Sequence, residues 1–570
     1  MDNKYKQIGR NDLTDIAGCF FENRGVNYKE YKSLDQSCVI PYSNLDNINE
    51  AVRLLQENAE NKIHIVVDCD ADGVTSAAIM YRYIKEVYGN TPTYSLHTGK
   101  QHGLSDDIQI PEDTDLLIIP DAGTNDVEQC KALSEKGVKI LILDHHLKEV
   151  ENPYAVIVNN QISENYTNKE FCGAGVVYKF LKAVDEDEWI EKADDYLDLV
   201  ALGNISDVMD MRSYETRYLT QLGIENIKSR ALKAFIKAQE RSLDRKIDII
   251  SIAFYISPLI NAVCRVGTAE DKEILFRAFA DDYEEFSYKP KKTEPGTIEN
   301  IYDRAARLAK NAKARQSKAV DKIVVDLKQQ VEDYGINKNP IMFVKADEKI
   351  ASEFTGLAAM KLADFYKKPC VILRKSDEVY RGSARNFDFS PFENLKETLE
   401  KTELFERCAG HENSFGVFIK PENINMVIKN LKEEYGNIKW SIPIDFCLSD
   451  DELNISVVRD IDSLKKYFAT GLKEPMLLIE NVRLIKSQCQ VMGKDESTWK
   501  FTREDNIEYI KFKSSENNPV LDWLKSDDEN DMYITVFGKA GFNAFGGLLT
   551  PQITITDYKV IKNTRKEDKM

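Results

Sequence analysis

The chain has 570 residues, of which 42% are hydrophobic, and a formal net charge of −18 at pH 7. This length predicts three or four domains, and the apolar content excludes a disordered protein. The acidic balance disfavours a protein that coats long duplexes, although a nucleic-acid enzyme needs only a local basic track, because charges beyond about 8–10 Å are screened.

Targeting signals and disulfides are not expected. The sequence has no uncharged apolar run of about 18 residues or more, which predicts no membrane span, and its N-terminus lacks the basic-then-apolar layout of a secretory signal. Its ten cysteines are scattered without a CxxC pair, as in proteins of a reducing compartment. We therefore expect a cytoplasmic protein with no membrane partner.

Four short apolar runs in the N-terminal half predict buried parallel strands. They are Ile63–Val67, Leu116–Pro120, Ile140–Leu143 and Ala155–Asn159, and helical patterns at Val74–Val87 and Val127–Lys136 lie between them. Strands that alternate with helices predict an open α/β sheet, which binds ligands beyond the carboxyl ends of its strands.

The rest of the chain contains a basic helical segment, a second α/β unit and a β-rich tail. A helical pattern covers Thr297–Asp333, and within Ile301–Gln330 it carries eight Lys or Arg against three Asp. This segment is either a solvated connecting helix or a basic helix that flanks a nucleic-acid channel. A second α/β unit spans Asn339–Gly436, and the short apolar runs that follow it predict a small β-barrel.

Three aspartates directly follow the first predicted strand. Asp68, Asp70 and Asp72 stand within five residues and repel one another, so the cluster needs cations, and hard divalent ions prefer oxygen ligands. An EF-hand is excluded, because the position that should hold its closing glutamate is Ile79.

Three further apolar runs also end in metal-ligand residue types. Leu116–Pro120 ends at Asp121, Ile140–Leu143 at Asp144-His145-His146, and Leu197–Leu202 leads to Asp207. We expect all four runs to end at one sheet edge. Mixed His and carboxylate ligands favour Mn²⁺, with Mg²⁺ as a substitute. Two such ions, about 3.5–4 Å apart and sharing a carboxylate, suit in-line attack on phosphorus. Asp121 is the best candidate bridge, since it stands alone on its strand end.

At these residues the sequence resembles the DHH phosphoesterase superfamily, named after the triplet Asp144-His145-His146, and within it the RecJ-type exonucleases. All four motifs occur in the family's order. The resemblance covers nearly the whole chain and includes Asn23-Arg24-Gly25-Val26, Gly173-Ala174-Gly175-Val176, Asp198–Met211, Asn261-Ala262-Val263-Cys264-Arg265, Gly382-Ser383-Ala384-Arg385 and Ala409-Gly410-His411.

The resemblance implies an α/β fold class with a parallel-sheet DHH domain, a second α/β DHH-associated domain and a C-terminal OB-like β-barrel. The expected boundaries are 1–285 for the N-terminal segment plus the DHH domain, 286–336 for the basic connecting helix, 337–440 for the DHH-associated domain and 441–570 for the barrel. It further implies a metal-dependent 5′→3′ exonuclease that degrades single-stranded DNA to mononucleotides in repair or recombination, with a single-strand-binding protein or helicase as partner.

Carried over by position, the metal ligands are Asp68, Asp70, Asp72, Asp121, His145 and Asp207. The catalytic pair is Asp121, as the bridge, and His146, which would contact the scissile phosphate. Strand phosphates, including the terminal 5′-phosphate, would be held by Arg265, Ser383, Arg385 and His411. Arginine supplies the bidentate geometry that such a pocket needs.

The sequence also departs from the family's pattern. Cys264 and Ala409 replace glycines, and the second motif reads Asp121-Ala122-Gly123-Thr124-Asn125-Asp126. A side chain now stands where backbone approaches phosphate closely. These changes indicate a divergent member, such as a mobile-element or phage version. None removes a candidate ligand, so we expect activity.

The tail would bind single strands by stacking bases on aromatics in a basic groove. Phe542 and Phe545, in a loop-like stretch, are the best exposed candidates. Two alternatives are kept. A DHH phosphodiesterase of short oligonucleotides or cyclic dinucleotides would not need this tail. A catalytically silent, single-strand-binding replisome scaffold would have lost ligands, which this chain keeps.

Overall fold

The computed structural model describes residues 5–99, 101–243, 247–288, 297–376, 378–438, 440–514, 518–528, 530–545 and 548–561. The chain divides into two compact units. The larger consists of Leu34–Asp388 and Phe392–Gly436, and the smaller of Met1–Ser33, Phe389–Pro391 and Asn437–Met570.

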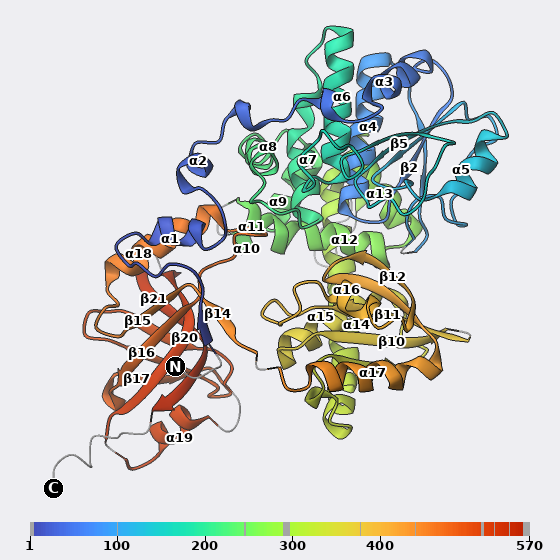
Figure 1. Ribbon diagram of the computed structural model, residues 1–570. Coiled ribbons are helices and arrows are strands. Elements are labelled where there is room, and N and C mark those ends of the chain that lie inside the picture. Colours follow the sequence, from blue (N-terminus) through green and yellow to red (C-terminus); the bar gives the residue numbers. More distant parts are fainter. Residues whose placement is uncertain are drawn as a thin grey trace. The chain divides into compact units, whose positions relative to one another are not determined.

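A five-stranded parallel sheet organises the first half of the larger unit (Figure 1). In spatial order its strands are β3 (Thr93–Leu96), β2 (Ile63–Val67), β4 (Leu116–Pro120), β5 (Lys139–Asp144) and β6 (Val156–Asn159). Every residue of β2 and β4 is buried, as in sheets that helices cover on both faces. The four expected strands are therefore confirmed, and β3 is an additional edge strand.

This half of the larger unit also contains a series of helices. They are α3 (Ile48–Glu57), α4 (Ala71–Tyr88), α5 (Val127–Ser134), α6 (Gly173–Glu188), α7 (Leu197–Ser206), α8 (Tyr214–Glu225), α9 (Arg230–Ala238), α10 (Glu240–Leu243), α11 (Ile249–Ser251), the π-helical turn η4 (Ile252–Ile256), α12 (Ser257–Val266) and α13 (Ala269–Phe279). Helices α4 and α6 pack on the sheet, and Cys130 of α5 packs against Leu117 and Ile119 of β4.

One strand-like expectation was wrong. The run Leu197–Leu202 forms the body of helix α7, whose residues 198–205 are all buried. A short, wholly apolar segment does not show which period it follows, because a buried helix is apolar on every side. Asp207 therefore enters the site from the C-terminal end of a helix and not from a strand.

One helical segment, Ile249–Val266, is long and apolar enough to pass a length-and-composition test for a membrane span. Of this segment 56% is buried inside the fold, as in core helices of soluble proteins, which pass the same test.

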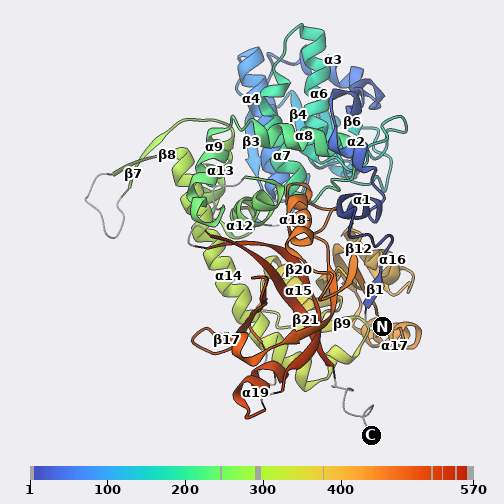
Figure 2. The ribbon, with the colours of Figure 1, turned by 90° about the vertical axis from the view of Figure 1, so that its left-hand side faces the viewer.

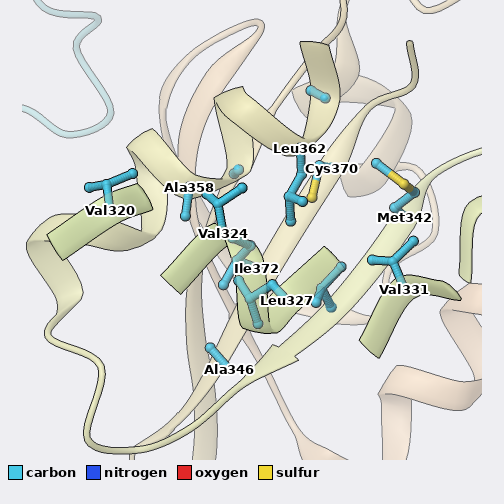
Figure 3. Close-up of a cluster of buried hydrophobic side chains, with 13 residues drawn as sticks. Val320, Val324, Leu327, Val331, Met342, Ala346, Ala358, Leu362, Cys370 and Ile372 are labelled. Atoms are coloured by element: carbon cyan, nitrogen blue, oxygen red, sulfur yellow. The ribbon is translucent and has the colours of Figure 1, made fainter. Parts of the chain in front are cut away.

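The second half of the larger unit is a mixed sheet joined to the first half by helix α14 (Ile301–Asp333). Its strands, in spatial order, are β12 (Phe405–His411), β13 (Ser414–Ile419), β11 (Val379–Arg385), β10 (Cys370–Ser376) and β9 (Met342–Ala346), and its helices are α15 (Ser352–Tyr366), α16 (Leu395–Glu400) and α17 (Pro421–Tyr435). Figure 3 shows Val320, Val324, Leu327 and Val331 of α14 facing β9, β10 and α15. Their helical spacing explains why α14 is an integral part of this core.

The charged side of α14 is partly neutralised. Arg304 pairs with Glu270 at 2.6 Å, Arg307 with Glu299 at 2.7 Å, and Arg315 with Asp271 at 3.3 Å. Lys318 and Lys322 are exposed. Residues Thr297–Asn300, expected as helix, form strand β8 instead and pair with β7 (Glu285–Tyr288); in Figure 2 this ribbon extends outward.

The smaller unit contains a seven-stranded sheet. In spatial order its strands are β15 (Phe446–Ser449), β16 (Leu477–Leu484), β20 (Met532–Phe545), β21 (Leu548–Ile561), β19 (Glu508–Lys511), β18 (Thr498–Thr502) and β17 (Cys489–Met492), with helices α18 (Ile455–Ser463) and α19 (Pro519–Lys525). The chain's start belongs here too, as β1 (Tyr5–Gln7), α1 (Ile16–Glu22) and α2 (Tyr28–Lys32).

The grouping of the first 33 residues differs from the sequence-based boundary, which joined them to the DHH domain. Strand β1 pairs in parallel with β14 (Ile442–Ile444), and Arg24 contacts Asp445 at 2.6 Å. The Arg24 guanidinium also donates to the carbonyl of Lys473. A pairing between residues more than 400 positions apart leaves no local signal in the sequence.

The tail's aromatic residues are mostly core. Trp499, Phe501, Tyr509 and Phe537 are buried, whereas Phe512 is 52% exposed. The stretch that contains Phe542 was expected to be a loop, but it continues strand β20 and pairs with β21. Phe542 is half-buried, and the side chain of Phe545 lies outside the described residues. Phe512 is therefore a better exposed stacking candidate than Phe542.

Candidate metal centre

The carboxyl ends of the central strands deliver the acidic residues to one place. Asp68 directly follows β2, Asp70 is the N-cap of α4, and Asp72 lies in the first turn of that helix. Asp121 follows β4, and His145 follows Asp144, the last residue of β5. Because these strands are parallel neighbours, their ends meet at the same edge of the sheet.

His145 lies at the centre of one group of ligands. Its Nε2 is 3.1 Å from Asp121 Oδ1, 3.4 Å from Asp207 Oδ2 and 3.9 Å from Asp72 Oδ2. Asp72, His145 and Asp207 offer ligand atoms that all lie within 4.8 Å of one another. Three of the other five predicted metal ligands thus converge around the imidazole of His145.

The other two predicted ligands form a second group with a residue that the sequence analysis missed. Asp68, Asp70 and His102 also offer ligand atoms within 4.8 Å of one another, and His102 Nδ1 lies 2.5 Å from Asp68 Oδ2. His102 follows no apolar run and belongs to no motif. Its one available signal was its rarity, since the chain has only six histidines.

Two glycines make room for the carboxylates. A Cβ on Gly173, the first residue of α6, would lie 2.5 Å from Asp121 Oδ1 and 2.8 Å from the Asp121 Cα. A Cβ on Gly203 of α7 would lie 2.4 Å from Asp72 Oδ1. The backbone N–H groups of Gly173 and Ala174 in turn donate to Asp72. Helix α6, which contributes no candidate ligand, therefore shapes the site through its N-terminus.

The donor set fits divalent cations. Asp121 Oδ1 and Asp207 Oδ2 are buried oxygens that have no hydrogen-bond partner among the described residues. Unpaired buried carboxylate oxygens are costly unless a cation completes them. Asp121 also adopts a left-handed conformation, with φ 67°, a strain that is typical of functional positions. Ions held here would supply an activated water and offset charge on the reacting phosphate.

Raised pKa values of two carboxyl groups also indicate that the cluster carries excess negative charge. Burial and the charges of Asp72 and Asp70 raise the pKa of Asp121 well above its usual range. Burial and the charges of Asp68 and Asp207 raise the pKa of Asp70 to about 6. Burial, followed by the charge of His146, lowers the pKa of His145, which keeps its imidazole neutral and able to ligate.

His146 has a different partner and a different protonation state. Asp144 accepts from Thr124 with one oxygen and from the His145 and His146 backbones with the other, so it has little capacity left for a metal. His146 Nδ1 lies 2.8 Å from that second oxygen. Burial opposes protonation, but the charge and hydrogen bond of Asp144 raise the pKa of His146 to about 10. Asp144 thus favours the protonated form of His146, which is suited to contact a phosphate.

The predicted phosphate-binding residues gather at one end of the mixed sheet. Arg385 of β11 and His411 of β12 both pair with Ser414 of β13. Burial and the charge of Arg265 lower the pKa of Arg385 to about 10. The Nε of Arg265 is buried without a hydrogen-bond partner in the part of the chain that the structure describes. Two neighbouring guanidinium groups of this kind are a natural anion site.

Two of these residues have additional contacts. Ser383 Oγ lies 2.8 Å from Thr355 Oγ1, and a Cβ on Gly356 would lie 2.6 Å from Arg385 Nη2, so this glycine accommodates the guanidinium. His411 Nε2 lies 3.7 Å from Asp207 Oδ1, which puts it beside the predicted metal ligands. His411 thus bridges the two groups of predicted site residues.

Two segments of the chain match the models of known domain families. Residues 62–204 match the DHH family, N-terminal domain, and residues 444–557 match the RecJ OB domain. Over 99% of both chains the sequence is 37% identical to a Bacillus subtilis (strain 168) protein whose name assigns it provisionally as an SPbeta prophage-derived single-strand DNA-specific exonuclease. It is 25% identical to the single-stranded-DNA-specific exonuclease RecJ of the same strain, over 90% of this chain and 63% of RecJ.

The fold is also similar to solved structures. RecJ from Thermus thermophilus in complex with Mn²⁺ matches 98% of this chain and 80% of its own, with a TM-score of 0.72 and 18% identity. The same protein in complex with Mg²⁺ gives a TM-score of 0.68 and 17% identity, over 98% and 78% of the two chains. At these identities the likeness is one of fold.

Proposed function

The chain belongs to the RecJ-type single-strand DNA-specific exonucleases with a DHH domain, and we propose that it removes nucleotides from the 5′ end of single-stranded DNA with the help of two divalent cations. We propose Mn²⁺ as the preferred ion and Mg²⁺ as a substitute, on the basis of the mixed His and carboxylate donors. Repair or recombination is the process that such an activity would serve.

The observation that carries this proposal is the convergence of carboxylates and imidazoles into three groups of possible ligands, which are Asp72 with His145 and Asp207, Asp68 with Asp70 and His102, and Asp121 with His145 and His146. Asp72, His145 and Asp207 would hold one ion, and Asp68 and Asp70 would contribute to the other. Asp121 Oδ1, which lies 3.1 Å from His145 Nε2, is the proposed shared ligand. Five aspartates in one cluster repel one another, and this repulsion destabilises the fold unless bound cations neutralise it.

The protein's own cations would fix the substrate. Protonated His146 would hold the scissile phosphate and stand ready to give its proton to the leaving oxygen. Arg265, Ser383 and Arg385 would hold the terminal 5′-phosphate. His411, beside Asp207, would contact a phosphate nearer to the site of cleavage. An exonuclease needs such an anion pocket at a fixed distance from the metal centre. With the terminal phosphate bound in the pocket, this distance determines that the first phosphodiester from the chain end is cleaved.

The function is tested by digesting matched single strands labelled at the 5′ or the 3′ end, as DNA and as RNA, with Mn²⁺ or Mg²⁺. We expect the 5′-labelled DNA to release labelled mononucleotide at once, while the 3′-labelled strand shortens progressively. A 5′-hydroxyl strand should be a poorer substrate, and Arg385→Ala should remove that difference.

Three outcomes would contradict the proposal. Early release of label from the 3′ end would reverse the polarity. Degradation of short oligonucleotides with stalling on long strands would indicate the phosphodiesterase alternative. Strand binding without any Mn²⁺-dependent product would indicate a silent scaffold.

A further inference from the structure

We propose that His102 is a metal ligand, which joins Asp68 and Asp70 in the second cation site and makes that site prefer Mn²⁺ to Mg²⁺. The inference rests on the proposed function only in treating this cluster as a metal centre. It adds a ligand that lies in none of the motifs through which the sequence resembles its family.

The first argument is position. His102 Nδ1 is 2.5 Å from Asp68 Oδ2, and its side chain is 50% exposed, so it lies at the mouth of the cluster with one side open to solvent. Asp68 itself is 1% exposed. Asp70 uses one oxygen to accept from the Gly73 N–H, and its other oxygen accepts no hydrogen bond from the residues that the structure describes. One ligand atom of each of these three residues lies within 4.8 Å of the other two, so they form a candidate three-ligand site.

The second argument is that the loop around His102 is held in place from both sides. The next residue's N–H, that of Gly103, donates to Asp68 Oδ1, and the N–H of Leu104 donates to Asp126. On the other side, the buried Lys272 ammonium donates to the carbonyls of His97 and Thr98. The position of the imidazole is therefore set by the fold before any ion arrives.

The third argument comes from His97, independently of His102. Its side chain is fully buried, its Nε2 has no hydrogen-bond partner among the described residues, and this atom lies 3.6 Å from Asp68 Oδ1. Its other nitrogen, Nδ1, lies 3.2 Å from Asp107. In the tautomer that donates from Nδ1 to Asp107, Nε2 turns a lone pair toward the Asp68 carboxylate. Positive charge beside Asp68, from a bound ion or from protonated His102, would stabilise this pair of acceptors.

If His102 is a ligand, each of the two proposed cation sites contains one imidazole. One group combines His145 with Asp72 and Asp207, and the other combines His102 with Asp68 and Asp70. Carboxylate and water ligands suit both Mg²⁺ and Mn²⁺. An imidazole nitrogen is a softer donor than oxygen, so adding one favours the transition metal Mn²⁺ over the harder Mg²⁺. A site with only Asp68 and Asp70 would not distinguish the two ions in this way, so His102 is the residue that confers the preference.

The test measures metal binding and needs no DNA. The full chain is titrated with Mn²⁺, and the electron paramagnetic resonance signal of the free ion counts how many ions are bound. We expect the wild type to bind two. In His102→Gln and His102→Asn one of the two should bind about 10–100-fold more weakly, the range seen when groups that support a metal site are removed. Competition by Mg²⁺ at that site should change far less.

Controls separate a ligand from a residue that only orients Asp68. Asparagine keeps an N–H that can reach a carboxylate, but it offers an amide oxygen where histidine offers a nitrogen. An unchanged selectivity for Mn²⁺ over Mg²⁺ in His102→Asn would therefore overturn the proposal. Gln101→Ala alters the same loop at an exposed position and should bind two ions normally. A direct reading on the wild type is the ¹⁴N coupling of bound Mn²⁺, which should fall from two imidazoles to one in His102→Gln; an unchanged spectrum would also overturn it.

The two proposals fail in different ways. If the wild type binds two Mn²⁺ ions and His102→Gln loses one, but no strand is ever cleaved, the ligand assignment stands and the exonuclease proposal falls. If cleavage occurs and the variants bind Mn²⁺ as the wild type does, His102 is not a ligand.

Discussion

Replacing Asp121 by asparagine should reduce single-strand cleavage by about 10³-fold or more and leave strand binding intact. The amide has almost the same shape as the carboxylate but no charge. The affected oxygen is buried, has no hydrogen-bond partner among the described residues and lies 3.1 Å from His145 Nε2. Removal of a single preorganised polar group from an active site costs about 10²–10³-fold in kcat, and a ligand shared by two ions should cost more.

Single-turnover cleavage of a 5′-phosphorylated oligonucleotide measures this effect, and filter binding of the same strand measures affinity. Asp113→Asn, an exposed aspartate of the same domain, is the matched control. If Asp121→Asn cleaves at the rate of that control, Asp121 is not the bridge. If it loses strand binding in parallel with cleavage, the carboxylate has a structural role instead.

Replacing Gly173 by alanine should have the second largest effect, although it adds only one methyl group. That methyl would lie 2.5 Å from Asp121 Oδ1 and 2.8 Å from the Asp121 Cα, so either the strand end or the start of α6 must move. The same N-terminus donates from Gly173 N to Asp72 at 2.6 Å. Since a misplacement of about 1 Å can cost on the order of 10²-fold in rate, we expect a loss of that order in kcat/KM.

Gly416→Ala is the control for this variant, because a Cβ there would meet no atom closer than 3.7 Å. Thermal melting of both variants checks the fold. The contact with the Asp121 backbone should lower the melting temperature of Gly173→Ala, so the activities of the two variants are compared at a temperature at which both are folded. Equal activity of the two variants would mean that the approach of α6 to Asp121 does not shape the site.

The parallel sheet and most of the site could be predicted from the sequence, because both leave short-range patterns. A buried parallel strand is a continuous apolar run, and a metal centre at its carboxyl end adds acidic residues directly after it. Asp68, Asp121 and His145 follow this rule. Asp207 was found by its motif, while the element before it was misassigned, since α7 is apolar on all sides.

What could not be predicted depends on contacts between distant parts of the chain. His102 reaches Asp68 across 34 positions, from a loop without a motif. The N-terminal strand β1 pairs with β14 over more than 400 positions. In the tail, short apolar runs predicted strands. They did not predict that Trp499 and Tyr509 are buried in the core while Phe512 is exposed. Burial of one face of a sheet depends on what packs against it.

The most direct test of the central claim is anomalous diffraction at the manganese absorption edge from crystals of the protein soaked in Mn²⁺. Two peaks about 3.5–4 Å apart are expected, one bounded by Asp72, His145 and Asp207 and the other by Asp68, Asp70 and His102, with Asp121 between them. A single peak, or peaks elsewhere on the protein, would contradict the two-ion centre on which the proposed chemistry depends.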